Sequence, residues 1–193
     1  MSEFCKDKIK NIRGDHVQRY KFASGAVSGF VLDAGCGCGY GSKILRGGAA
    51  KVLGVDKSRE AVQYAREYYS EVNISFLVGD ITTITVADVP FDFDHIVAFE
   101  FIEHLKDPGP VLKNMALMAK SLTMSVPNQE NRPYDKAKFP YHFRHFSPQE
   151  IEDVLISVGW TDLKFYHQKD LTPGRIFTGT GGLTLIIKAT REN

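Results

Sequence analysis

Short apolar runs that alternate with amphipathic stretches constrain the fold of this 193-residue chain more than any other feature. Five runs have the length and composition of buried strands, and most are separated by segments with apolar residues at helical spacing. We expect these strands at residues 30–33, 51–56, 74–80, 95–99 and 122–126, with a closing pair at 163–168 and 183–189. We expect helices at residues 15–28, 40–46, 58–69, 111–119 and 147–159. Strands separated by helices predict a mostly parallel sheet, and the closing pair, which no helix separates, predicts an antiparallel edge.

Three of the expected helices carry start signals. The segment Ser147 to Glu150 combines a capping serine, a proline in the first turn and a capping-box acid. Ser58 is expected to cap the helix that follows it. Asp15 and Gln18 have capping-box spacing, so we expect the first helix to begin at Asp15.

Composition and charge exclude several classes of protein. Hydrophobic residues make up 43% of the chain and charged residues 24%, as in a globular domain with a full core. The formal net charge of +1 disfavours bulk nucleic acid or an anionic membrane as the main partner, and no segment has the apolar length that spans a bilayer. The three cysteines (Cys5, Cys36 and Cys38) follow no charged-then-apolar leader and are odd in number. They disfavour a disulfide framework and predict a cytoplasmic protein.

The segment after the first expected strand reads VLDAGCGCGYG. Its Gly35, Gly37 and Gly39 have the spacing G-x-G-x-G, and glycine at a strand end lets the backbone approach a ligand closely. Dinucleotide-binding enzymes have G-x-G-x-x-G instead, and the required third glycine position holds Tyr40. Asp33, just before the loop, would repel a pyrophosphate. The loop therefore favours a ligand with a cationic end and opposes a nicotinamide-dependent oxidoreductase.

Two further acids fall at expected strand ends. Asp56 ends the second strand about twenty residues after the loop, where a carboxylate can accept both hydroxyls of a ribose. Gly79 and Asp80 close the third strand and suit the edge of an adenine. Because ligands of open α/β sheets bind at the carboxyl ends of the strands, these positions together predict an adenosine-containing ligand.

These motifs resemble those of the class I S-adenosylmethionine-dependent methyltransferases, in the branch that modifies small molecules and glycans. The segments that carry the resemblance run in the family's order from Val31 to Trp160: VLDAGCGCGYG, GVDKSREAVQYAR, FLVGD, FEFIEHLKDP, and SVPN followed by YHFRHFSPQEIEDVLISVGW. The resemblance implies an α/β fold, a single Rossmann-like doubly wound domain whose seven-stranded sheet is mostly parallel with an antiparallel last strand and helices on both faces. Two departures are Cys38, where threonine or serine is usual, and the missing Pro-Gly-Gly turn before the fifth strand.

The resemblance also implies S-adenosylmethionine as the cofactor. In the family's pattern Asp33 and the residues from Gly35 to Gly39 hold the methionine end, Asp56 the ribose, and Asp80 with Ile81 the adenine. The predicted cofactor-binding residues are Asp33, Gly35, Cys36, Gly37, Gly39, Asp56, Lys57, Asp80, Ile81 and Phe99.

Candidate catalytic residues follow the fourth strand. Glu100, Glu103 and His104 form an E-x-x-E-H pattern beside the expected position of the reactive methyl group, and His142 lies in the segment that usually covers the acceptor. Methyl transfer requires alignment of the acceptor and, for a hydroxyl or amine, a base near its proton. We therefore predict His104, His142 and Glu100 as catalytic residues. The alternative is that Glu100 caps a turn and His104 packs under the loop.

The same pattern also suggests a metal. E-x-x-E-H with a later histidine is similar to the metal set of methyltransferases that modify the 2′-hydroxyl at small-RNA ends. Oxygen and imidazole ligands suit a divalent cation such as Mg²⁺ or Mn²⁺. The candidate ligands are Glu100, Glu103, His104 and His142. The two cysteines of the glycine loop, in contrast, lack partner ligands at zinc spacing.

The methyl acceptor is less constrained. Cations and aromatic rings are interleaved over residues 132–146, which suits an anionic acceptor such as a nucleotide sugar, or describes a solvated loop pinned by its rings. The resemblance favours O-methylation of a sugar or another small molecule. Three alternatives stay open: a non-catalytic S-adenosylmethionine-binding protein, an enzyme that uses the cofactor for another reaction such as a lyase, and methylation of an RNA end. No RNA-binding module or basic stripe supports the last.

The sequence predicts one domain over residues 1–193 with four parts. They are an N-terminal helical segment over the cofactor site (1–29), the cofactor-binding core (30–126), an acceptor-side loop (127–146), and a closing helix and strands (147–193). The oligomeric state stays open.

Overall fold

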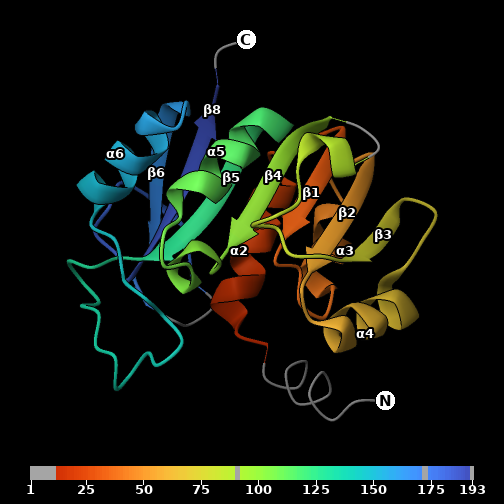
Figure 1. Ribbon diagram of the computed structural model, residues 1–193. Coiled ribbons are helices and arrows are strands. Elements are labelled where there is room, and N and C mark those ends of the chain that lie inside the picture. The colour runs from red at the N-terminus through yellow and green to blue at the C-terminus, as the bar shows by residue number, and fades with distance from the viewer. Residues whose placement is uncertain (1–11, 90–91, 171–173, 192–193) are drawn as a thin grey trace.

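An eight-stranded sheet runs through the part of the chain that the computed structural model describes, residues 12–89, 92–170 and 174–191 (Figure 1). The strands are β1 (Phe30–Ala34), β2 (Lys51–Asp56), β3 (Ile74–Val78), β4 (Phe93–Phe99), β5 (Ala119–Pro127), β6 (Thr161–Gln168), β7 (Phe177–Thr178) and β8 (Thr184–Thr190). The seven expected strands are present, and the two-residue β7 is an addition. A strand this short has no alternation of apolar and polar residues by which a sequence could reveal it.

The order of the strands in the sheet is β3-β2-β1-β4-β5-β8-β6-β7. The neighbouring strands β3, β2, β1, β4 and β5 all run parallel to one another, whereas β8 runs antiparallel to both β5 and β6. The prediction of a mostly parallel sheet with an antiparallel end is therefore confirmed. Since parallel strands end at the same edge of a sheet, the loops after β1, β2, β3 and β4 converge there.

Helices cover both faces of the sheet (Figure 1). The α-helices of the described chain are α2 (Gly14–Ser24), α3 (Tyr40–Leu45), α4 (Arg59–Tyr69), α5 (Gly109–Met118) and α6 (Pro148–Ser157), with short 3₁₀ helices η1 (Val86–Asp88) and η2 (Ile102–His104). Successive strand residues supply opposite cores: Leu32 packs in the cluster with α5 and α6, and Val31 in the cluster with α2 and α3. Because both faces are covered, the central strands are apolar on both faces over most of their length, which is why they appear as apolar runs.

Two of the three predicted helix starts are confirmed. The Ser58 hydroxyl accepts from the backbone N–H of Ala61, and Ser147 and Glu150 form the reciprocal capping box. The prediction for the first helix is wrong. Helix α2 begins at Gly14 after the cap residue Arg13, which makes no side-chain capping bond, and it ends at Ser24, four residues before the predicted end.

Two of the expectations from composition concern the cysteines and membrane-spanning segments. Cys36 is a buried free thiol, whereas Cys38 is disulfide-bonded. Cys5 lies outside the described residues. Among the described helices, none is long and apolar enough to cross a membrane.

Candidate active site

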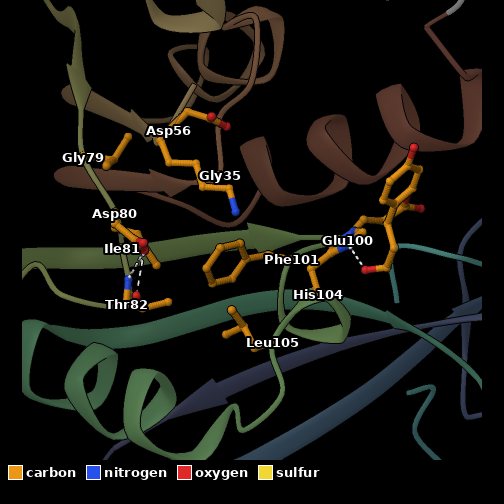
Figure 2. Close-up of a pocket in the computed structure, with 13 residues that line it drawn as sticks. Gly35, Asp56, Gly79, Asp80, Ile81, Thr82, Glu100, Phe101, His104 and Leu105 are labelled. Atoms are coloured by element: carbon orange, nitrogen blue, oxygen red, sulfur yellow. Dashed lines mark hydrogen bonds between the residues drawn. The ribbon is translucent and has the colours of Figure 1, made fainter. Parts of the chain in front are cut away.

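A pocket of about 630 Å³ lies at the carboxyl ends of the parallel strands (Figure 2). Figure 2 shows the Asp80 to Thr82 turn at one end of it, Glu100 and His104 at the other, and the Phe101 ring between them. Its lining residues are Gly35, Val55, Asp56, Lys57, Gly79, Asp80, Ile81, Thr82, Glu100, Phe101, His104, Leu105 and Tyr141. The size is that of a small-molecule site, and the lining joins predicted cofactor residues to predicted catalytic residues.

The glycine loop turns through a left-handed backbone at Gly35, Gly37 and Gly39. Gly35 has φ of 76° and its N–H donates to the carbonyl of Val55, which holds the loop against β2. Gly39 has φ of 87°, and a Cβ atom there would lie 2.6 Å from Cβ of Ala65 in α4. Side chains rarely adopt this conformation, and at Gly39 there is no room for one. The loop can therefore pass under α4 only with glycine at this position.

The carboxylate of Asp56 has a fixed orientation at the pocket wall. It accepts from the backbone N–H of Gly37 at 2.9 Å through one oxygen and from that of Ser58 at 2.8 Å through the other. These bonds tie the glycine loop to the end of β2 through a single side chain. A carboxylate held in this way is suited to accept from ligand hydroxyls through its remaining lone pairs.

The other end of the pocket combines an acid with apolar walls. Asp80 accepts from the backbone N–H and the hydroxyl of Thr82, and these bonds lower its pKa below the ordinary value. Ile81 and Leu105 line the same pocket, so a flat ring could lie between apolar side chains while its edge meets polar groups.

Asp33 lies beneath the pocket rather than in its lining. Its side chain is fully buried and accepts from the hydroxyls of Tyr20 at 2.9 Å and Ser42 at 2.6 Å. Burial raises its pKa to about 6 against the effect of these two bonds. Asp33 thus ties α2 and α3 to β1.

Several other predicted residues also lie outside the pocket lining. They are Cys36, Gly37, Gly39, Phe99, Glu103 and His142. Burial raises the pKa of Cys36, and the Phe99 ring packs edge-on against Tyr20 at 5.0 Å. His16, which sequence reasoning missed, packs beside these rings and shares a hydrogen bond with the Tyr40 hydroxyl. No local motif marks His16, because two of its partners, Tyr40 and Phe99, lie far along the chain.

Glu100 lines the pocket, but its carboxylate has two arginine partners from α2 and its cap. Arg19 donates to it at 2.5 Å and Arg13 at 3.3 Å. Burial alone would raise the pKa of Glu100, but Arg19, His16 and Arg13 together lower it below the ordinary value. The backbone φ of 48° at Glu100 is rare for a residue with a side chain. Glu100 is therefore an ion-paired anchor at the end of β4 rather than an unengaged carboxylate.

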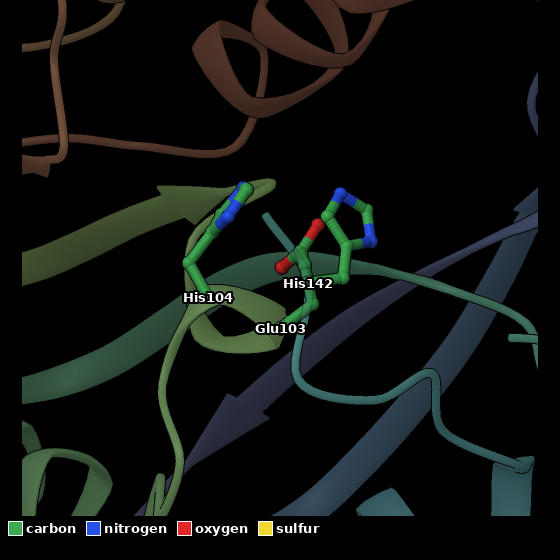
Figure 3. A group of neighbouring side chains, drawn as sticks. All are labelled: Glu103, His104 and His142. Carbon is green, nitrogen blue, oxygen red and sulfur yellow. The ribbon is translucent and has the colours of Figure 1, made fainter. Parts of the chain in front are cut away.

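Glu103, His104 and His142 meet beside the pocket (Figure 3). One ligand atom from each lies within 4.8 Å of the others, and Figure 3 shows the three side chains directed to a common space. Glu103 is fully buried, and neither carboxylate oxygen has a hydrogen-bond partner in the described chain. Burial, followed by the charge of Glu100, raises its pKa to about 8. Glu100 is not a member of this cluster, unlike in the predicted metal set.

Hydrogen bonds assign the protons of the histidines. Nδ1 of His104 lies 2.9 Å from the carbonyl of Tyr141, so it must donate, which leaves Nε2 with a lone pair. Nδ1 of His145 likewise donates to the carbonyl of Arg132 at 2.6 Å, so its Nε2 accepts from Nδ1 of His142 at 3.0 Å. Burial, with His104 and His145, lowers the pKa of His142 to about 4, so that this ring is neutral. In the neutral form of each ring, these bonds make Nε2 the unprotonated nitrogen of His104 and of His142.

Comparison with known proteins identifies the family. A family model described as a methyltransferase domain matches residues 28–154. Over 138 residues the chain is 30% identical to a probable S-adenosylmethionine-dependent methyltransferase of Mycobacterium tuberculosis. The chain belongs to the S-adenosylmethionine-dependent methyltransferases. A second methyltransferase, the ubiquinone biosynthesis O-methyltransferase of Coxiella burnetii, is 34% identical over 158 residues.

The sequence relatives are matched over a smaller share of their length than the solved structure is. The aligned parts cover 69% and 81% of this chain, but only 49% and 64% of the mycobacterial and Coxiella methyltransferases. The crystal structure of a possible histamine N-methyltransferase from Thermotoga maritima has a TM-score of 0.76, with 98% of this chain and 95% of that chain covered at 20% identity. The fold is therefore that of the class I methyltransferases.

Proposed function

We propose that this chain transfers the methyl group of S-adenosylmethionine to a hydroxyl of a small-molecule acceptor, such as a sugar. The observation that carries the proposal is the single pocket that joins the oriented carboxylate of Asp56 to His104, whose Nε2 keeps a lone pair. The Coxiella relative, an O-methyltransferase by name, supports oxygen as the acceptor atom.

The proposed cofactor position follows from the polar groups of the pocket. Asp56 would accept from the ribose hydroxyls, and Asp80 with Ile81 would bound the adenine. The methionine end would lie along the glycine loop toward Glu100, above the buried Asp33. Gly35 supports this path because its missing side chain opens the pocket wall next to Phe101.

The chemical step needs alignment and one proton acceptor. An acceptor oxygen attacks the methyl carbon, the carbon–sulfur bond breaks, and its electron pair neutralises the sulfonium. The hydroxyl proton passes to Nε2 of His104 or His142, which the hydrogen bonds at Nδ1 keep ready to accept it. We assign Glu100 to positioning, because Arg13 and Arg19 engage its carboxylate.

Two measurements test the proposal. Calorimetry should detect binding of S-adenosylhomocysteine and none of NAD. Incubation with labelled S-adenosylmethionine and a metabolite extract should yield a labelled product together with S-adenosylhomocysteine. Binding without product would indicate the non-catalytic alternative, and consumption of cofactor without methylated product would indicate a lyase.

A second candidate function is metal-assisted methyl transfer, and the cluster of Glu103, His104 and His142 favours it. A buried carboxylate with no described hydrogen-bond partner and two imidazole nitrogens are a donor set that fits a divalent cation. The hydrogen bonds at Nδ1 of both histidines are those that usually orient metal ligands. A bound Mg²⁺ or Mn²⁺ would lower the pKa of an acceptor hydroxyl.

A chelator separates the two candidates. Under the metal-assisted mechanism a chelator should abolish turnover and Mn²⁺ should restore it, and Glu103→Gln should remove the response to Mn²⁺. Turnover that a chelator leaves unchanged would support the histidine base alone. An RNA end as the acceptor would require RNA fragments to be labelled in the same assay, which the net charge of +1 and the lack of a basic stripe do not favour.

A further inference from the structure

Arg132 is a cation beside the proposed acceptor site that has no assigned role. We propose that its guanidinium binds an anionic group, a carboxylate or a phosphate, on the methyl acceptor. The proposal deepens the function above and rests on it, because the same pocket must hold the cofactor and the acceptor.

The backbone of Arg132 is fixed on both sides. Its N–H donates to the carbonyl of Asn128 at 2.7 Å, and its carbonyl accepts from Nδ1 of His145 at 2.6 Å. Asn128 is fully buried and donates in turn to the carbonyl of Gly182 at 2.9 Å. The start of the Arg132 side chain is therefore as well anchored as a residue in a strand, although it lies in a loop.

Three successive ring contacts connect the guanidinium of Arg132 to the pocket lining. The guanidinium lies 4.6 Å from the ring centre of Phe139, which stacks on His142 at 5.3 Å with an interplanar angle of 24°. His142 in turn contacts His104 edge-on at 4.7 Å, and His104 lines the pocket. Stacking on a ring orients a guanidinium plane while leaving the N–H groups at its edge free to donate.

The charge of Arg132 has no counter-ion within the described residues. No carboxylate oxygen of that part of the chain lies within salt-bridge distance, and no side-chain hydrogen bond is made, although the charges of Glu100, Glu103 and Asp15 reach it. Partial burial lowers its pKa. A guanidinium that is partly removed from water and lacks an ion partner gains more from a bound anion than an exposed one does.

Two of the neighbouring acids, Asp15 and Glu100, already have arginine partners. Arg19 pairs with Asp15 at 3.1 Å and with Glu100 at 2.5 Å, and Arg13 reaches both of the same carboxylates. The third neighbouring acid, Glu103, is fully buried, and neither of its oxygens has a partner in the described chain. No described acid therefore pairs with Arg132, and an acceptor that brings a negative charge would supply that partner.

Other cations of the same loop either have a carboxylate nearby or are exposed to solvent. Arg144 pairs with Glu150 at 3.1 Å, and Lys138 lies 3.8 Å from Asp135. Lys136 is exposed, and it provides a matched control because its removal takes the same charge from the same loop.

The test measures binding to the full chain of three probes, glucose, glucuronate and glucose 6-phosphate, each titrated with and without S-adenosylhomocysteine. The wild type should bind at least one of the two anions about 10- to 100-fold more tightly than glucose. Arg132→Gln should abolish that preference, and Lys136→Gln should keep it. Arg132→Lys should keep part of it, because the charge remains while the planar fork is lost. The stronger of the two anions identifies carboxylate or phosphate.

Three results would overturn the proposal. They are a wild type that binds neither anion more tightly than glucose, an Arg132→Gln variant that keeps the preference, and a Lys136→Gln variant that loses it equally. The affinity for S-adenosylhomocysteine should be the same in all variants, which shows that they are folded. A wild type that fails to bind S-adenosylhomocysteine would instead refute the proposed function, and the titrations without it keep the two failures apart.

Discussion

His145 is buried behind the proposed proton acceptors and touches the reaction only through His142. Its Nδ1 donates to a backbone carbonyl, which leaves Nε2 to accept the proton of His142. This bond places the proton of the neutral His142 ring on Nδ1 and leaves Nε2 unprotonated. At the scale of single residues, His145 is therefore a positioning residue that controls a tautomer.

We predict that His145→Phe lowers kcat about 10- to 100-fold, the usual cost of losing a partner that orients a ligand or base. The affinity for S-adenosylhomocysteine should stay within twofold, because His145 does not line the pocket. His145→Gln should recover part of the rate, since an amide can still accept from His142. Equal losses in both variants would mean that His145 only fills space.

Asp33 makes the free energy of unfolding decrease as the pH rises. Burial raises its pKa to about 6 from 3.8, so the folded state binds a proton more tightly than the unfolded state does. The stabilisation that this tighter proton binding adds to the free energy of unfolding is fully present below pH 3.8 and is lost as the pH rises through 6. The shift corresponds to about 3 kcal/mol.

We predict that Asp33→Asn removes this dependence. Urea unfolding of the wild type at pH 4.5 and 7.5 should show a fall in stability with pH that the variant lacks, of about 2 kcal/mol, because the part of the effect below pH 4.5 lies outside this interval. Asp107→Asn, at an exposed acid, is the control and should follow the wild type. The same slope in Asp33→Asn and wild type would assign the effect to other groups.

At the scale of elements, α2 is anchored by Arg19, which joins three parts of the fold. Its guanidinium pairs with Asp15 of the same helix, with Glu100 after β4, and with Gln168 at the end of β6 at 2.7 Å. The side chain of Gln168 also donates to the backbone carbonyl of Asp15 at 3.0 Å. The helix above Asp33 is thus held by polar bonds in a buried setting.

We predict that Arg19→Ala lowers the free energy of unfolding by about 3–5 kcal/mol, because it removes the fully buried partner of Asp15, Glu100 and Gln168 and leaves the two acids with Arg13 alone. Lys43→Ala, which breaks the exposed ion pair with Glu71, should cost less than about 1 kcal/mol. Urea denaturation measures both. A cost for Arg19→Ala no larger than that for Lys43→Ala would contradict the anchoring role.

Local signals and distant partners explain what the sequence could and could not predict. Ser58 and Ser147 cap their helices with bonds to residues three positions on, so a motif suffices. Asp15 has the same spacing to Gln18, but Arg13 and Arg19 engage its carboxylate, and it lies inside the helix. The pattern of one segment cannot show that competition.

In the candidate site, too, the sequence could predict some contacts, whereas others depend on residues far away in the chain. E-x-x-E-H and the later His142 meet because the loop after β5 follows the strand next to β4, and strand order was foreseeable from the fold class. The sequence placed Glu100 among the bases and metal ligands because it could not show that Arg13 and Arg19, more than eighty positions earlier, would engage it. Arg132 and His145 belonged to the stretch of cations and rings over residues 132–146, but the sequence could not show which of its members lie near the site.

At the scale of the whole molecule, ligand binding should couple to stability. S-adenosylhomocysteine at 100 times its dissociation constant should add about 2.7 kcal/mol to the free energy of unfolding, and NAD should add nothing. Asp56→Ala should weaken the binding by about 1–3 kcal/mol, because bound polar groups lose their partner. Thermal unfolding with and without ligand measures both effects. A shift with NAD, or an unchanged shift in Asp56→Ala, would contradict the proposed ribose contact.

The bond between Arg19 and Gln168 also affects the order in which the chain can fold during translation. The two residues are 149 positions apart in the chain. At translation rates of about 5–20 residues per second, roughly 7 to 30 s pass between their synthesis. During that interval the first strands and the glycine loop can pair on the ribosome, while α2 still lacks its anchor at β6. A nascent chain stalled before residue 168 should therefore expose α2 to protease, and a longer one should protect it.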